Sequence, residues 1–274
     1  MTSITAPTPD HSPSVGAARR SAWQGHLQAM PDALRSEWIK LASVRSNRVL
    51  LALTAVIGAI AAFATAKLVT DEVLTVAQVF VYPAVFTAVF AAVAGILLFT
   101  SEAQHGTLAL TLAAQPARHV IAASKALVAV GLGITLGAVG MAGAAGGAAL
   151  GGLALGDVSA MAATAGWALL YTSTAATMGL GIGVIARHSA GAISGVLVWW
   201  FVAENLLRTF IPPSIGRFLP FDAGYRTLGV GSNFDTPEIL AVALRRPQYA
   251  LIFATYAILT LATGAMLLGR RDVN

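Results

Sequence analysis

The stretch VLLALTAVIGAIAAFATA, residues 49–66, contains no charged side chain. A helix needs about 20 mostly apolar residues to cross a hydrocarbon core of about 30 Å. This stretch therefore predicts a transmembrane helix, and five later stretches have the same character. We expect an all-α membrane protein with six transmembrane helices at about 49–66, 79–100, 126–150, 160–186, 191–210 and 249–269.

The amino-acid composition supports a membrane protein. Hydrophobic residues make up 57% of the chain and charged residues only 11%, whereas a soluble domain carries about 25% charged residues. The net charge of +5 does not indicate nucleic-acid binding, because the basic residues flank apolar runs instead of forming a patch. The chain has no cysteine, which excludes disulfides, thiolate metal sites and thiol nucleophiles.

The segment before the first span divides into two parts. Residues 1–30 are rich in Pro, Ser and Thr and lack an apolar core, so we expect a disordered cytoplasmic tail and not a signal peptide. Residues 31–48 predict an amphipathic helix in the membrane interface, with Leu34 and Trp38 on the face opposite Lys40. A plain extension of the first span is the alternative. Residues 49–271 form the six-span transmembrane domain.

The orientation follows from the basic residues. Six spans place both termini on one side, and a cytoplasmic N-terminus puts eleven of the 17 Lys and Arg residues inside. This agrees with the positive-inside rule. We therefore expect a multi-pass protein of the cell membrane with both termini cytoplasmic, although Arg245 and Arg246 before the sixth span do not fit the rule.

Two connections between spans have a distinct composition. Residues 101–125, cytoplasmic in this topology, contain a short run bounded by Gly106 and Pro116. This run predicts either a compact docking element for a soluble partner or a simple connecting loop. The last outer connection, about 211–247, contains Pro212, Pro213, Pro220 and Pro237 together with apolar residues, which predicts short helices at the outer membrane face.

Two stretches together resemble a known family. They are LRSEWIKLASVRSNRVLLALT, residues 34–54, and LLFTSEAQHGTLALTLAAQPARHVIAASKALVA, residues 97–129. They resemble the membrane-spanning permease subunits of type-2 ABC exporters of the actinobacterial type, in which an SE-xx-HGT stretch opens the coupling helix. The resemblance covers roughly residues 33–270.

The resemblance implies a function and partners. Two permease copies, identical or related, would form the translocation path in the lipid bilayer, and each would contact a separate ATP-binding-cassette ATPase subunit through residues 101–118. Glu102, Gly106 and Thr107 match the positions that the family places against the ATPase. This chain has Gln104 where the family often has Arg, so a charge-assisted contact is not expected there.

The sequence lacks the motifs of several enzyme classes. No G-x-x-x-x-G-K-[ST] run is present, so ATP hydrolysis would require the partner chain. The five histidines show no H-E-x-x-H or similar metal-ligand spacing. We therefore expect a transport subunit that is not itself an enzyme and that has no cofactor, no metal site and no catalytic residue.

Within the spans, two features suggest specific roles. Gly143, Gly147 and Gly151 repeat every four residues and predict a face for close helix packing. Glu204 is the main ionisable residue inside a span, with Arg208 four residues later on the same helix face. Glu204 is either a polar point on the transport pathway or part of an outer ion pair with Arg208.

Two other functions remain open from the sequence. An ion-coupled secondary transporter would need intramembrane carboxylates or paired broken helices, and only Glu204 offers itself. A non-transport membrane scaffold or immunity component would use the glycine-rich faces to bind another membrane protein. The residues do not identify a transported substrate.

Overall fold

The computed structural model describes residues 31, 34–39, 45–70, 72–107, 118–229 and 235–270. Six helical segments in this part of the chain are long and apolar enough to cross a membrane. The prediction of six spans in a multi-pass membrane protein is therefore confirmed. The segments are Ser46–Leu68, Val76–Gln104, His119–Leu150, Val158–Ala186, Ser189–Phe210 and Arg246–Arg270.

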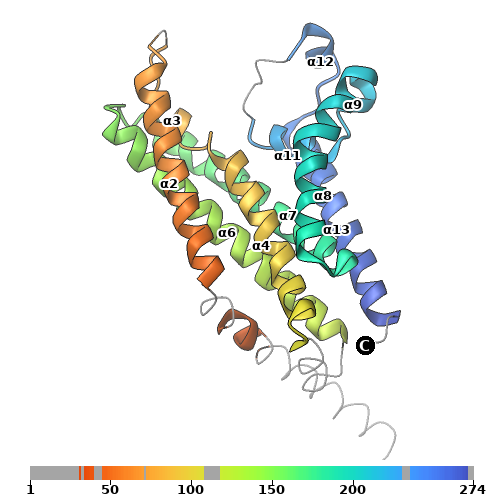
Figure 1. Ribbon diagram of the computed structural model, residues 1–274. Coiled ribbons are helices and arrows are strands. Elements are labelled where there is room, and N and C mark those ends of the chain that lie inside the picture. Colours follow the sequence, from red (N-terminus) through yellow and green to blue (C-terminus); the bar gives the residue numbers. More distant parts are fainter. Residues whose placement is uncertain are drawn as a thin grey trace, which may run out of the picture.

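The helices form one bundle around three central members (Figure 1). Helix α4 (Ala84–Gln104) packs against α7 (Val158–Ala186), and both contact α6 (Arg118–Leu150). Helix α2 (Arg45–Leu68) covers α6, and α13 (Arg246–Arg270) covers α7. The fifth span consists of three successive helical pieces, α8 (Ser189–Val198), η1 (Trp199–Ala203) and α9 (Glu204–Phe210).

The bundle has two distinct ends. Helix α2 begins and α13 ends at the lower end of Figure 1, which we call the termini end. The opposite end, the loop end, carries four short helices (Figure 1): α3 (Val76–Val79), α10 (Pro213–Gly216), α11 (Pro220–Arg226) and α12 (Pro237–Ala241). An isolated β-bridge between Thr75 and Ala154 joins α3 to the α6–α7 connection. Short helices therefore do occur in the connection between the fifth and sixth spans, where the prolines predicted them.

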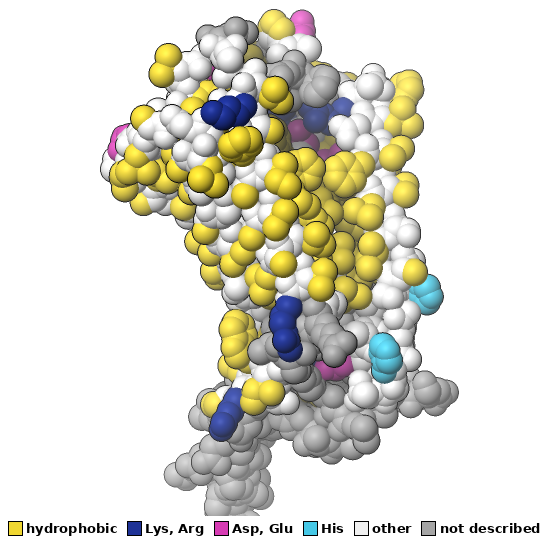
Figure 2. Space-filling view, turned by 60° about the vertical axis from the view of Figure 1, so that its left-hand side comes forward, with side chains coloured by type: hydrophobic (Ala, Val, Ile, Leu, Met, Phe, Trp, Pro, Cys, Tyr) yellow, Lys and Arg dark blue, Asp and Glu magenta, His cyan; other side chains and the backbone are white. Residues whose placement is uncertain are grey.

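Charged side chains lie mainly at these two ends. Figure 2 shows hydrophobic side chains covering the middle of one face, with basic and acidic side chains above and below them. Helix α6 is 33 residues long, which corresponds to about 50 Å at about 1.5 Å per residue. It is thus longer than the hydrocarbon core of about 30 Å. It begins at Arg118, earlier than the expected start of the span at 126, so residues 118–125 extend this helix beyond the predicted span.

The predicted glycine face lies at the contact between α6 and α2. A Cβ atom added to Gly147 would lie 2.0 Å from the Ala59 carbonyl oxygen, and one on Gly143 would lie 2.3 Å from the Ala55 oxygen. One on Gly151 would lie 2.4 Å from the Ala66 Cβ. No side chain fits at these distances, so the three glycines allow the two backbones to approach closely.

The segment before α2 is described only in part. Residues 34–39 are helical, but residues 40–44 lie outside the described residues. The interfacial helix over 31–48 therefore stays a prediction. The predicted tail, 1–30, also lies outside the described residues, as do 108–117 of the coupling segment and the terminal residues 271–274.

Candidate functional site

The predicted coupling residues lie where α4 ends, at the termini end. Glu102 is in the last turn of α4, and His105 caps the helix by donating its backbone N–H to the Ser101 carbonyl oxygen at 3.1 Å. Gly106 follows with φ +72°, a left-handed conformation that glycine adopts without strain just after a helix. The glycine of the SE-xx-HGT stretch therefore has a structural role in ending this helix.

Glu102 also belongs to a buried cluster of three charged side chains, which we call the termini-end triad. The Lys125 Nζ lies 2.8 Å from the Glu37 Oε2 and 3.0 Å from the Glu102 Oε2. The same Nζ donates a hydrogen bond to the Leu98 carbonyl oxygen at 3.3 Å. The Lys125 side chain is only 2% exposed. The triad therefore joins the helical residues 34–39 to α4 and α6.

Sequence reasoning missed Lys125 and Glu37. Lys125 lies seven residues into α6, and a lysine followed by an apolar run was a signal of a paired charge at the edge of a span. Its two carboxylate partners are far away in the sequence, so spacing could not identify them. An isolated buried charge costs roughly several kcal/mol. The pairing of Lys125 with the two carboxylates offsets this cost.

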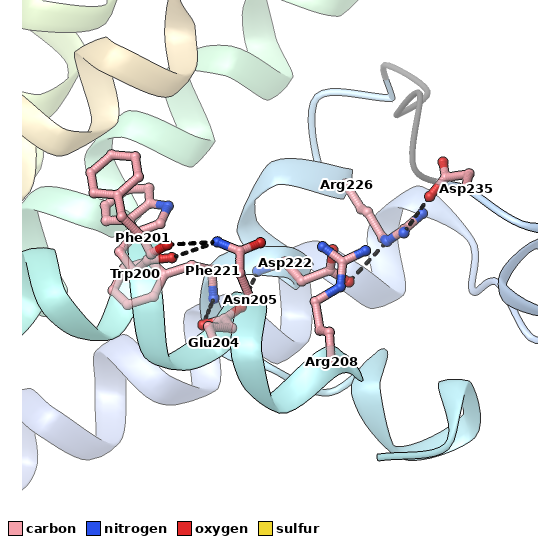
Figure 3. Close-up of polar contacts among 9 residues, drawn as sticks. All are labelled: Trp200, Phe201, Glu204, Asn205, Arg208, Phe221, Asp222, Arg226 and Asp235. Atoms are coloured by element: carbon pink, nitrogen blue, oxygen red, sulfur yellow. Dashed lines mark hydrogen bonds and ion pairs between the residues drawn. The ribbon is translucent and has the colours of Figure 1, made fainter. Parts of the chain in front are cut away.

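The second candidate cluster lies at the loop end and includes Glu204. The buried Glu204 carboxylate accepts hydrogen bonds from the backbone N–H groups of Phe221, at 3.2 Å, and Asp222, at 2.5 Å (Figure 3). Both N–H groups lie in the first turn of α11, which lacks internal acceptors for them. Glu204 thus fastens the connection between the fifth and sixth spans to the fifth span.

Asp222 links the same cluster to two arginines. Its Oδ1 lies 3.0 Å from the Arg208 Nη1, and its Oδ2 lies 2.9 Å from the Arg226 Nε (Figure 3). The Arg226 Nη2 continues to the Asp235 Oδ1 at 2.7 Å. Burial opposes the charge on Arg226, but the hydrogen bonds and charges of Asp235 and Asp222 outweigh it and raise its pKa above the usual value.

Arg208 therefore has a different partner from the one that its spacing from Glu204 suggested. The i, i+4 spacing places the two side chains on the same side of α9. Backbone N–H groups occupy the Glu204 carboxylate, and Asp222 supplies the carboxylate for Arg208. The expected charges are present at this end, but the acidic partner comes from the connection between the fifth and sixth spans, about which helix periodicity gives no information.

A π-helical turn precedes Glu204. Residues Trp199–Ala203 form the π-helix η1, a wider turn that is often found at functional sites. The Asn205 side-chain amide donates hydrogen bonds to the carbonyl oxygens of Trp200, at 3.3 Å, and Phe201, at 3.1 Å (Figure 3). These bonds tie the Asn205 side chain to the π-helical turn.

Aromatic side chains hold α11 against the spans. The Phe221 ring stacks on Trp200 of η1 with centroids 4.0 Å apart. It also lies 6.3 Å from Phe253 of α13, which lies 5.6 Å from Tyr171 of α7. The buried Tyr171 hydroxyl has no hydrogen-bond partner within the described part of the chain. The loop end is thus packed by aromatic rings and bridged by ion pairs.

Neither cluster is a group of metal ligands. Within the described residues, no group of three His, Cys, Asp or Glu side chains is arranged to hold a metal ion. Both clusters combine acidic with basic side chains, an arrangement that fixes helices relative to one another. No family model and no curated protein matches this sequence. Function therefore rests on the geometry and on the resemblance of residues 34–54 and 97–129.

Proposed function

We propose that the chain is the permease subunit of an ATP-binding-cassette exporter in the cell membrane. Two copies form the translocation path, and each binds a separate ATPase subunit at the termini end, which faces the cytoplasm. The end of α4, with Glu102, Gly106 and Thr107, is part of the contact. The observation that carries this proposal is the position of Glu102, in the last turn of α4 and 3.0 Å from the Lys125 Nζ.

This position suggests how a movement of the ATPase reaches the spans. A displacement of the α4 end moves Glu102, and Lys125 passes the movement to α6 and, through Glu37, to residues 34–39. Because α6 also packs closely on α2, the helices α6 and α2 and residues 34–39 all follow the end of α4. Coupling between distant sites travels through such contiguous ion pairs and packed helices.

Co-purification tests the partner directly. The tagged full-length chain is extracted from its native membrane in mild detergent, and the proteins that elute with it are identified by mass spectrometry. We expect a nucleotide-binding subunit with a Walker-type P-loop in amounts comparable to the chain. Elution of the chain without any nucleotide-binding subunit would contradict the proposal and favour a membrane scaffold or immunity component.

A substitution at Glu102 tests the coupling. Glu102→Ala keeps the pair between Lys125 and Glu37 and the hydrogen bond from Lys125 to Leu98, so the bundle retains its structure while the ion pair to the last turn of α4 is lost. We expect the purified complex to hydrolyse ATP with little transport. Gly106→Pro should have a similar effect, because proline cannot adopt φ +72°. Glu238→Ala, an exposed change on α12 at the opposite end, is the control. Normal ATPase stimulation and normal transport in both variants would contradict the coupling assignment.

The ion-coupled alternative receives less support from the loop end. A coupling carboxylate must exchange its ion during each cycle. The Glu204 carboxylate instead accepts two backbone hydrogen bonds that fix α11. Transport that follows an ion gradient in vesicles without the ATPase subunit would support this alternative over the exporter.

A further inference from the structure

A small cavity lies at the loop end, beside the cluster of Figure 3. It is bounded by residues of α9 to α13, and its volume is about 40 Å³. A single water needs about 10–15 Å³ measured in this way, so the space holds a few waters or one small polyatomic group. Its polar lining consists of Arg208, Arg217, Asp222, Arg226 and Tyr249.

Not all donors in this lining have an acceptor among the described residues. The Arg217 Nη1 donates to the Val242 carbonyl oxygen at 3.0 Å, but the buried Arg217 Nε has no hydrogen-bond partner among the described residues. The Tyr249 hydroxyl accepts the Leu244 N–H at 3.1 Å, which leaves its own proton to donate. A buried donor without an acceptor costs about 1–3 kcal/mol, and a bound acceptor would remove that cost.

The charge of the lining favours an anion. Three of its side chains are guanidinium groups and one is a carboxylate. Arg208 and Arg226 share Asp222, and Arg226 also pairs with Asp235. No ion pair to Arg217 is found among the described residues. Guanidinium groups bind phosphate and carboxylate oxygens through paired N–H donors.

The surroundings indicate where the anion comes from. Phe210, at the end of the fifth span, is 78% exposed, and Ile215 and Phe218 are also exposed. The Arg217 guanidinium lies 5.0 Å from the Phe218 ring centroid. Exposed aromatic and apolar side chains next to arginines are typical of the depth at which lipid headgroups lie.

We propose that this cavity binds a phosphate oxyanion, supplied by a phospholipid headgroup of the outer leaflet. Arg217 is the main ligand, through its Nε, with Arg208 and the Tyr249 hydroxyl as further donors. The site does not depend on the ATPase subunit, so it can be tested on the purified permease alone. A bound headgroup bridges α9 to the outer connection and stabilises the loop end.

Native mass spectrometry of the purified full-length chain measures this binding. The probes are dioctanoyl-phosphatidylglycerol, the phosphate-free dioctanoylglycerol and inorganic phosphate. We expect the phosphatidylglycerol to bind the wild type and Arg217→Gln to bind it at least tenfold more weakly. Arg217→Lys keeps the charge without the fork of donors and should bind with intermediate affinity. Arg245→Gln is the matched control, because Arg245 is exposed in the same connection and does not line the cavity.

The outcomes separate the sources of the anion. If millimolar inorganic phosphate displaces the lipid from the wild type, the site takes the free oxyanion as well as the headgroup. If phosphate does not displace it and binding still depends on Arg217, the site takes only the lipid phosphate. Equal lipid affinity of Arg217→Gln and Arg245→Gln would overturn the proposal. Equal binding of dioctanoylglycerol and the phosphatidylglycerol to the wild type would overturn it too.

Discussion

At the termini end one ammonium group lies between two carboxylates, whereas at the loop end two guanidinium groups share one carboxylate. The lysine of the triad is almost completely buried, and the cavity beside it has a volume of only about 10 Å³. The loop-end cavity has about 40 Å³. The Arg208 side chain next to it is 26% exposed.

This difference separates two uses of charge. Among the described residues, the cavity that Lys125 lines has room for about one water, so we assign the charges of the termini-end triad to holding or moving helices. The loop-end cluster keeps donors and space, so its charges can also bind a small group from outside. The number of charged side chains alone does not distinguish a cluster that holds helices together from one that binds a ligand.

The largest expected effect comes from removing the central charge of the termini-end triad. Lys125→Met leaves the Glu37 and Glu102 carboxylates buried near each other, and we expect a loss of about 3–5 kcal/mol in the free energy of unfolding. Unfolding in mixtures of detergent and SDS measures it. Lys67→Met, at an exposed lysine of α2, is the control. A Lys125→Met loss no larger than that of the control would show that the triad does not hold the termini end.

The next largest effect concerns the glycine face between α6 and α2, where the contact depends on close packing and not on charge. A side chain on Gly147 would collide with the Ala59 carbonyl group, so Gly147→Leu should cost about 3 kcal/mol by separating α2 from α6. Gly146→Leu is a matched control, because a Cβ there meets nothing within 4 Å. Its effect should stay within about 0.5 kcal/mol. The Gly147 loss should be the same at low and high salt, and equal losses in the two variants would mean that the glycine face does not set this contact.

A smaller effect is expected at the loop end. Asp222→Asn removes the carboxylate shared by Arg208 and Arg226, and we expect a loss of about 2 kcal/mol. It should be smaller than that of Lys125→Met, because Arg226 keeps Asp235 and Arg208 reaches solvent. The same unfolding assay compares the two, with Glu238→Gln as the control. A larger loss for Asp222→Asn than for Lys125→Met would reverse the proposed contrast between the ends.

The smallest effect concerns an exposed cap. The hydrogen bonds from the Ser159 hydroxyl and from the backbone N–H groups of Ser159 and Ala160 hold the pKa of Asp157 below its usual value of 3.8. The cap is therefore fully effective above pH 3.8 and is lost as the pH falls through the lowered pKa. We expect the Tm of the wild type to fall slightly in that acidic window. Asp157→Asn, which also caps a helix, should show less of this decrease, and an identical pH dependence would contradict the assignment.

The spans and the glycine face could be predicted because both depend on local pattern. An apolar run of sufficient length specifies a membrane helix, and glycines every four residues specify one face of it. The partners in the two charge clusters could not be predicted. Glu37 and Lys125 are separated by 88 positions, and Asp222 reaches Arg208 because the Glu204 hydrogen bonds and aromatic packing place α11 against the fifth span. Tertiary contacts of this kind leave no periodic signal in one sequence.

The absence of cysteine from the chain allows the most direct test of the central claim, that the termini end faces the cytoplasm and contacts an ATPase. Single cysteines are introduced as His105→Cys at the end of α4 and as Leu155→Cys at the loop end. The native side chains at both positions are exposed. In intact cells, a membrane-impermeant thiol reagent should label only the Leu155→Cys variant. In extracted membranes, a cysteine-directed crosslinker should join only the His105→Cys variant to a nucleotide-binding subunit. Labelling of His105→Cys from outside, or a crosslink to that subunit from Leu155→Cys alone, would contradict the account.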